Sequence, residues 1–177
     1  MAKSTWAVDA SHSGIDFTVK HMMIANVKGS FGSFSANIEA DPHDLTTASI
    51  SFTIDAASID TRNADRDNHL RSADFFDVEN HPHIVFKSTK ITRKGDGEYD
   101  VTGELTIRGV TRTETFTAVF EGEGKDPWGN EKVGFSGTGK IKRSDYGLTW
   151  NAVLETGGVL VGDEIKFSVE IEAVRQA

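Results

Sequence analysis

The stretch RNADRDNHLRSADFFDVENHPHIVF, residues 62–86, holds the densest collection of side chains that could take part in chemistry. It carries three of the six histidines of the chain, with three arginines and four aspartates among them. Side chains of these types can bind a metal ion, transfer protons, or anchor a loop through ion pairs. Each of these roles makes a different demand on their spacing.

A metal site finds weak support in this stretch. His81 and His83 lie two positions apart and His69 is near in sequence, but Pro82 separates the first two. No spacing such as HExxH is present, and the absence of cysteine leaves only histidine and carboxylate ligands for zinc. Oxygen ligands could come from Asp65, Asp67, Asp74 and Asp77. We expect loop hydrogen bonds and helix caps here, with no bound metal ion and no cofactor.

Nucleophilic and phosphate-binding motifs are absent in their functional form. No G-x-S-x-G sequence occurs, and Ser136 in GFSGTG does not complete one. The segment GFSGTGKI, residues 134–141, matches G-x-x-x-x-G-K but has Ile141 where a magnesium-binding hydroxyl belongs. It also lies within an alternating strand pattern, so no helix N-terminus follows to hold a phosphate. The sequence therefore argues against a serine hydrolase and a nucleotide hydrolase.

From Arg62 to Asp74 the charged residues alternate in sign. The three arginines interleave with aspartates in the order Arg62, Asp65, Arg66, Asp67, Arg71 and Asp74. This pattern is typical of a self-compensating ion-pair network, which holds a loop and leaves little net charge for a substrate. We expect this cluster to anchor the loop rather than to catalyse a reaction.

Composition and charge limit the class of protein. A chain of 177 residues fits one domain, which we assign to residues 1–177. Its net charge of −8 and the lack of a basic block argue against nucleic acid and anionic membrane surfaces as partners. No stretch approaches the roughly 20 apolar residues of a membrane span, and the first residues lack the apolar core of a secretory signal. These features predict a cytoplasmic protein that does not span a membrane.

The dominant hydrophobic period is two, which predicts β-strands with one apolar and one polar face. In YDVTGELTIR, for example, Tyr99, Val101, Leu105 and Ile107 alternate with polar residues. The same pattern recurs within residues 15–19, 50–54, 116–120, 133–141 and 165–171, with turn signals such as DPHD and RKGDGE between. We expect an all-β fold of eight or nine antiparallel strands, either a sandwich or a barrel. Glycines within the strands favour the barrel: Gly103, Gly137 and Gly139.

Two segments depart from the strand period. HMMIANVKG, residues 21–29, predicts a helical turn that stops at Gly29. NADRDNHLRSADFF, residues 63–76, predicts a short helix with Asn63 as its N-cap. We expect this helix to form a lid or plug at one end of the barrel, with Phe75 and Phe76 turned inward.

The barrel interior is the remaining candidate for a functional site. A barrel of this strand number encloses just enough space for its side chains or for one slender ligand. The residues expected to line or fill it are Phe17, Val19, Phe31, Phe34, Phe52, Ile54, Phe86, Leu105, Ile107, Phe116, Phe120 and Phe167. Periodicity does not distinguish a lined lumen from a filled core, and both interpretations stay open.

Four stretches of the chain carry a resemblance to a known family. They are HSGIDFTVKHMMIANVKGSF, ASIDTRNADRDNHLRSADFFDVENHPHIVF, GELTIRGVT and RSDYGL, and the resemblance covers nearly the whole sequence. The chain resembles the YceI-like, polyisoprenoid-binding family. This resemblance implies an extended, lipocalin-like barrel of eight antiparallel strands with one or two short helices. It also implies a lumen that takes a long isoprenoid or other amphiphilic lipid, and a homodimer.

The resemblance also suggests roles for single residues. Leu70, Phe75, Phe76 and Phe86 are expected to face the lipid tail. The flexible thioethers of Met22 and Met23 could adapt to an irregular chain. A polar head group could meet His21, Arg71 or Trp150.

Three functions remain after these arguments. The first is sequestration or transport of a polyisoprenoid or similar lipid, without catalysis. The second is an enzyme that acts on an isoprenoid or quinone-like ligand through His69, His81 or His83, with or without a metal. The third is a fully packed barrel that serves as an interaction or stress-response protein.

Overall fold

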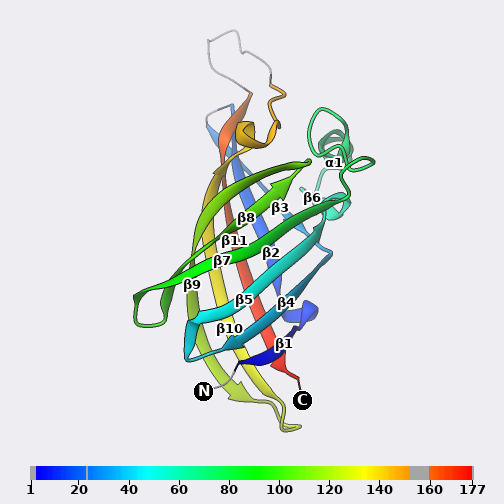
Figure 1. Cartoon of the computed structure of the whole chain (residues 1–177). Coiled ribbons are helices and arrows are strands. Elements are labelled where there is room, and N and C mark those ends of the chain that lie inside the picture. The colour runs from blue at the N-terminus through cyan, green and yellow to red at the C-terminus, as the bar shows by residue number, and fades with distance from the viewer. Residues whose placement is uncertain (1–2, 23, 152–159, 177) are drawn as a thin grey trace.

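The computed structural model describes residues 3–22, 24–151 and 160–176. Strands dominate this part of the chain, with one α-helix and three short 3₁₀ helices (Figure 1). The strands are β1 (Ser4–Val8), β2 (Gly14–His21), β3 (Ala25–Phe31), β4 (Phe34–Asp41), β5 (Asp44–Asp55), β6 (Ile59–Asp60), β7 (His83–Gly95), β8 (Glu98–Ile107), β9 (Val110–Lys125), β10 (Glu131–Lys142) and β11 (Val161–Arg175). The helices are α1 (Ala64–Arg71), η1 (Ala10–His12), η2 (Ala56–Ser58) and η3 (Arg143–Tyr146).

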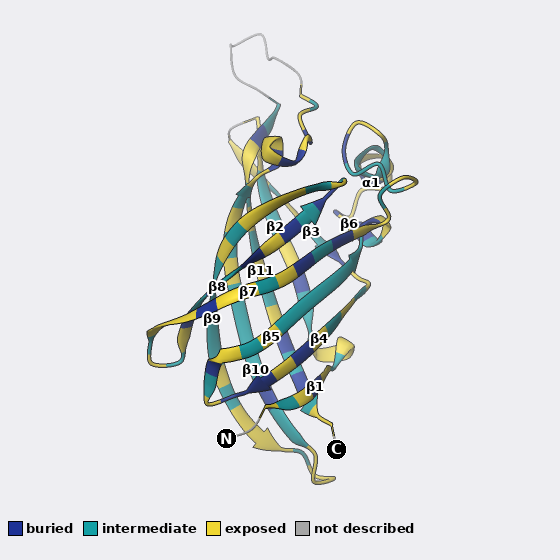
Figure 2. Ribbon diagram, in the orientation of Figure 1, coloured by how far each residue is buried: buried dark blue, intermediate teal, exposed yellow. Residues whose placement is uncertain are grey.

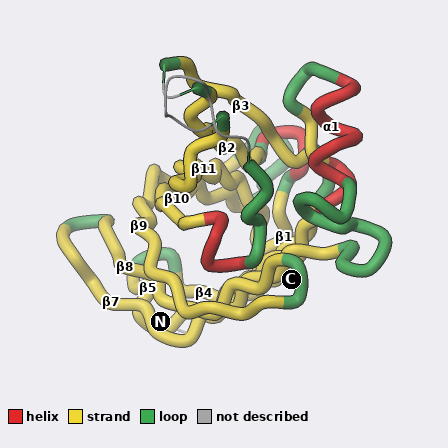
Figure 3. Tube along the Cα trace, turned by 90° about the horizontal axis from the view of Figure 1, so that it is seen from above, coloured by secondary structure: helices red, strands yellow, loops and turns green. Residues whose placement is uncertain are grey.

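Antiparallel pairing closes the sheet into an eight-stranded barrel. Hydrogen bonds link β1, β4, β5, β7, β8, β9, β10 and β11 in that order, and β11 returns to β1. Seen from above, these strands form a ring (Figure 3). The all-β, closed-barrel prediction is therefore confirmed, and the sandwich alternative is wrong.

The long strand β11 pairs with two partners along one edge. Its C-terminal part pairs with β1, where Trp6 faces Arg175, and its N-terminal part pairs with β2, where Phe17 faces Phe167. Between β1 and β2 the 3₁₀ turn η1 bends the chain, and the side chain of Asp9 caps this turn by accepting from the Ser11 amide at 3.0 Å. The bend lets one stretch of chain follow the curved barrel wall.

The strands are two-faced, as the hydrophobic period predicts. In β8, Tyr99, Val101, Leu105 and Ile107 are buried, while Glu104 is exposed. Figure 2 shows this alternation as bands along the barrel wall. The inward faces together supply most of the hydrophobic core.

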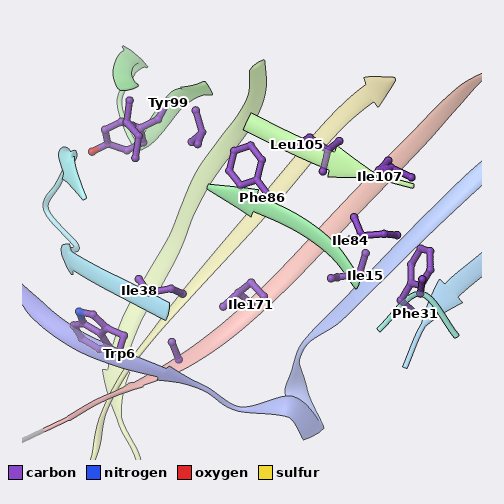
Figure 4. Packing of buried hydrophobic residues seen from close by; sticks show 14 of the residues in the cluster. Trp6, Ile15, Phe31, Ile38, Ile84, Phe86, Tyr99, Leu105, Ile107 and Ile171 are labelled. Atoms are coloured by element: carbon purple, nitrogen blue, oxygen red, sulfur yellow. The ribbon is translucent and has the colours of Figure 1, made fainter. Parts of the chain in front are cut away.

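Large side chains fill the barrel end at which the two termini lie (Figure 1). The indole of Trp6 is buried next to Ile38 (Figure 4), and its Nε1 donates to the main-chain oxygen of Ala40 at 3.1 Å. Tyr99 and Val133 are each 2% exposed. These buried side chains close this end of the barrel.

The helical turn predicted within residues 21–29 is wrong. β2 and β3 form a hairpin in which Val19 faces Val27 and His21 faces Ala25. Met22 adopts a left-handed φ of 54° in the turn. Cross-strand pairing and burial of the alternating apolar residues outweigh the local helix preference of this segment.

The second predicted helix is confirmed at its start. The side chain of Asn63 accepts from the Arg66 amide at 3.0 Å and caps α1, which ends at Arg71 rather than continuing to residue 76. The helix stands at the end of the barrel opposite the termini (Figure 1). Phe75, 6% exposed, follows it and points into the core.

The loop around α1 is anchored, but not by the predicted ion-pair network. Arg71 donates to the main-chain oxygens of Ala57 and Ile59 at 2.9 and 3.1 Å, and Arg66 donates to that of Thr61 at 2.8 Å. Within the described residues no salt bridge joins the arginines and aspartates of residues 62–77. The reason is that irregular chain after β5 leaves carbonyls unpaired, and the arginine forks satisfy them.

Aromatic rings lie over glycines on the inner wall of the barrel. A Cβ atom at Gly139 would stand 2.5 Å from a ring carbon of Phe116 and 2.6 Å from one of Phe167. Those two rings meet edge to face, with centroids 4.6 Å apart. Phe17 covers Gly29 in the same way. The missing side chains provide the room that these rings occupy against the wall.

Substitution of Gly139 by alanine tests this packing. We expect the added methyl group to push the two rings toward the lumen and to lower the free energy of unfolding by about 1–3 kcal/mol. The matched control is Gly137→Ala in the same strand, where a Cβ would make only ordinary contacts of 3.7 and 3.9 Å. Urea denaturation measures both, and equal stability of the two variants would contradict the account.

Candidate ligand cavity

A cavity of about 450 Å³ occupies the barrel above the packed end. Strands place alternate apolar side chains in its wall, such as Phe17 and Val19 of β2 or Leu105 and Ile107 of β8. The lining is almost wholly apolar, and its volume falls in the range of small-molecule sites. An apolar space of this kind favours an apolar guest over water.

Most of the residues predicted to meet a ligand stand in the cavity wall. They are Phe17, Val19, His21, Phe31, Phe52, Ile54, Leu70, Phe75, Phe76, Phe86, Leu105, Ile107 and Trp150. Contact of these residues with a ligand stays a prediction.

The other predicted site residues lie elsewhere. Phe34 packs on Phe52, with ring centroids 6.4 Å apart, but does not line the cavity. Met22 is 40% exposed at the β2–β3 turn, and Arg71 binds carbonyls of the preceding chain. Met23 lies outside the described residues.

Sequence reasoning predicted His21 but missed other polar groups in the cavity wall, above all Arg143. This arginine follows β10 directly and is 6% exposed. It begins the RSDYGL stretch, which carried the family resemblance but gave no role to its arginine. Because Arg143 follows a strand rich in small residues, the hydrophobic period gave no indication that its side chain is buried.

The guanidinium of Arg143 is a bridge between backbone segments. Its Nε donates to the oxygen of Gly162 at 2.8 Å, and one terminal nitrogen donates to Leu148 and Trp150 at 2.7 and 2.9 Å. The other donates to Val161 at 3.2 Å. Desolvation by burial lowers the pKa of Arg143, and the charge of a nearby carboxylate partly opposes this shift. Arg143 therefore ties the segment after η3 to the start of β11.

Aromatic residues cover the barrel end beside this arginine. The His69 ring of α1 lies edge-on to Trp150, with centroids 4.6 Å apart, and 5.1 Å from Phe75. The Arg143 guanidinium lies 5.9 Å from the centroid of the Phe75 ring. His69 Nε2 also contacts an Asp74 carboxylate oxygen at 2.9 Å. These contacts hold α1 and the chain after η3 together over the cavity.

The cavity reaches the surface at this end. The exposed residues Lys20 and Arg66 stand in its wall, as do His21 and His69. Together with Arg143, they make every ionisable group of the described lining basic. The arrangement can hold a long apolar chain in the lumen with its polar end near α1.

The three histidines of the enzyme hypothesis do not form one cluster. His69 lines the cavity, but His81 and His83 do not. His83 Nε2 lies 3.4 Å from an Asp55 carboxylate oxygen on the exterior, and the His81 ring lies over Gly109. The predicted loop contacts thus describe these residues better than a shared catalytic centre.

Within the described residues, Asp9, His12 and Glu172 place one potential metal ligand atom each within 4.8 Å of one another. The Nζ of Lys132 lies 3.8 Å from Asp9 and 3.6 Å from Glu172. The hydrogen bonds from Ser11 and His12 hold the pKa of Asp9 far below its usual range, and Asp9 raises the pKa of His12. The Lys132 ammonium and the His12 ring face both carboxylates, so the cluster acts as an ion-pair lock on the η1 bend.

Comparison with known proteins identifies the family of this chain. The model of the YceI-like domain matches residues 6–173. The chain belongs to the YceI-like family. A UPF0312 protein of Staphylococcus aureus (strain N315) is 41% identical over 170 residues, which cover 96% of each protein.

Two solved structures share the fold of this YceI-like chain. BcnA of Burkholderia cenocepacia superposes with a TM-score of 0.82 at 29% identity, covering 93% of this chain and 98% of BcnA. A polyisoprenoid binding domain from Saccharophagus degradans gives a TM-score of 0.72 at 14% identity, covering 97% of this chain and 98% of that domain. The second likeness concerns the fold alone. In the described parts of this chain, no helix has the length and apolarity needed to span a membrane.

The ion-pair lock should give the protein a pH-dependent stability, and a His12→Asn variant should lose the part of it that involves His12. The raised pKa of His12 adds stability below about pH 6.5, which is lost as the pH rises through the raised value. The lowered pKa of Asp9 adds stability above about pH 4, which is lost as the pH falls toward the lowered value. We expect the melting temperatures of the two proteins to differ most near pH 5–6 and least near pH 9. A difference independent of pH would contradict this.

The four carbonyl contacts of Arg143 should make it more important than a surface arginine. Arg143→Lys loses the fork and leaves buried carbonyls unpaired, so we expect a loss of about 1–3 kcal/mol in unfolding free energy. Arg112→Lys is the control, because exposed Arg112 donates a single bond of 3.1 Å to the oxygen of Asp145. Its stability should change by less than about 0.5 kcal/mol. Equal losses in urea denaturation would show that the bridge is unimportant.

Proposed function

We propose that this YceI-like protein binds a polyisoprenoid or another long amphiphilic lipid in its barrel and sequesters or transports it. The observation that carries the proposal is the apolar cavity, closed at the Trp6 end and open beside α1. Family membership and the polyisoprenoid binding of the structural neighbour from Saccharophagus degradans support the same ligand class.

Burial of the tail supplies the driving force. Each methylene removed from water contributes about 0.8 kcal/mol, so a few five-carbon isoprene units give a large gross gain. Ordering of the chain and loss of its free motion offset part of that gain. Phenylalanine rings such as those of Phe86 and Phe116 give an apolar wall that requires no hydrogen-bonding partner from the ligand. Such a cavity discriminates chain length and apolarity better than head-group chemistry.

The lipid would lie with its polar end toward α1. Lys20, His21 and Arg66 are polar residues that line the cavity there. The other end of the lumen is closed by buried apolar and aromatic side chains. A tail therefore gains most contact when it enters first and the head group stays near the surface.

The proposal includes no chemical step. His69 is the one histidine of the three candidates in the cavity wall, and it is engaged with Asp74 and with the rings of Phe75 and Trp150. The variants His81→Ala and His83→Ala should leave lipid affinity within a factor of a few, because both residues lie outside the cavity wall. Loss of a turnover with retained lipid binding would instead support the enzyme hypothesis.

Blocking the lumen tests the proposal directly. Ala118 lines the cavity opposite Gly137, so Ala118→Phe places a ring in a part of the wall built from small residues. We expect this variant to fold and to lose affinity for a fluorescent prenyl probe by at least tenfold. The control is Thr113→Phe, at an exposed position of the same strand.

Fluorescence titration with the prenyl probe, together with circular dichroism, measures affinity and folding. Unchanged affinity in the folded Ala118→Phe variant would contradict a luminal site.

We propose further that the protein is a cytoplasmic homodimer. Light scattering after gel filtration would test the dimer, and cell fractionation would test the location.

A further inference from the structure

Exposed large apolar side chains are rare on this barrel. Among the described residues they are Met22 at 40%, Ile24 at 82% and Trp128 at 83% relative exposure. Met22 and Ile24 belong to the turn of the β2–β3 hairpin, at the same end of the barrel as α1 (Figure 1). Trp128 belongs to the β9–β10 turn at the opposite end (Figure 1).

The β2–β3 hairpin also forms part of the cavity wall. Val19 and Val27, which face each other across the hairpin, line the lumen together with Lys20 and His21. Met22 donates its amide hydrogen to the oxygen of Leu160, another lining residue, at 2.8 Å. The apolar side chains at the turn therefore stand next to the opening of the cavity.

The charges of the hairpin differ from those of the whole chain. Between Lys20 and Lys28 the sequence contains two lysines and a histidine but no acidic residue, although the net charge of the protein is −8. A short segment with apolar side chains and flanking lysines suits the interface of a bilayer, where lysine meets lipid phosphate and the apolar groups reach the acyl region. The overall negative charge argues against broad adhesion, but not against contact through this one turn.

We propose that Met22 and Ile24, flanked by Lys20 and Lys28, dock the open end of the barrel onto a lipid bilayer. This inference rests on the proposed function, because docking gives a lipid tail a short route between bilayer and lumen. Contact through two side chains is weak and reversible, which suits a carrier that must leave the membrane again.

The experiment compares Met22→Ser/Ile24→Ser with wild type, and with Trp128→Ser as the matched control. Vesicles of phosphatidylcholine, with and without phosphatidylglycerol, carry a fluorescent prenyl probe, and transfer to the protein is followed by stopped flow. The same probe is also delivered from cyclodextrin, which bypasses the membrane. Wild type and Trp128→Ser should extract the probe from vesicles at equal rates, faster when phosphatidylglycerol is present.

The double variant should extract the probe from vesicles at least about tenfold more slowly, since it loses two apolar groups, but should bind it normally from cyclodextrin. Equal extraction rates for wild type and the double variant would overturn docking and leave the proposed function intact. A change in oligomeric state of the double variant without slower extraction would assign the turn to a second copy of the chain and overturn it too.

Failure of wild type to bind the probe from either source would contradict the proposed function itself. Docking would then be judged by sedimentation with the vesicles alone. Wild type and Trp128→Ser should pellet with the vesicles and the double variant should not, and equal pelleting of all three would overturn docking.

Discussion

Closure of the barrel is the constraint on which the rest of this structure depends. Once β11 pairs with both β10 and β1, each inward side chain must fit within a fixed circumference. The wall meets this demand by placing rings over glycines, as Phe116 and Phe167 do over Gly139. Because the rings occupy the space of missing side chains, the lumen keeps a cavity of about 450 Å³ instead of a filled core.

The two ends of the barrel are stabilised in different ways. At the end with the termini, Trp6 and Tyr99 complete an ordinary core in which the indole nitrogen finds the oxygen of Ala40. At the other end, backbone contacts from Arg71 and Arg143 hold irregular chain in place without filling the lumen. Arginine suits this work because one planar fork satisfies several carbonyls at once. The chain at this end of the barrel is therefore held in place while the lumen beneath it keeps its cavity.

The sequence predicted the strands because period two follows directly from two-faced burial, as β8 with Val101 and Leu105 shows. It also located the cap at Asn63, since that bond is local. Sequence reasoning failed where contacts between separate segments determine the structure. Met22 lies in a hairpin turn because β2 and β3 pair, and Arg71 binds carbonyls that the spacing of residues does not reveal. The choice between a lined and a filled lumen depended on ring positions over glycines, which periodicity does not encode. Arg143 was missed for the same reason, because its four acceptors come from separate segments.

Native mass spectrometry of the purified protein, before and after incubation with prenyl lipids of several lengths, tests the central claim most directly. The account predicts a complex of one lipid per chain, with organic extraction releasing a long apolar molecule and retention that depends on tail length. A mass equal to the bare polypeptide under every condition would contradict it. The barrel would then be closed to lipids by its own aromatic rings, and the cavity would have no role in binding.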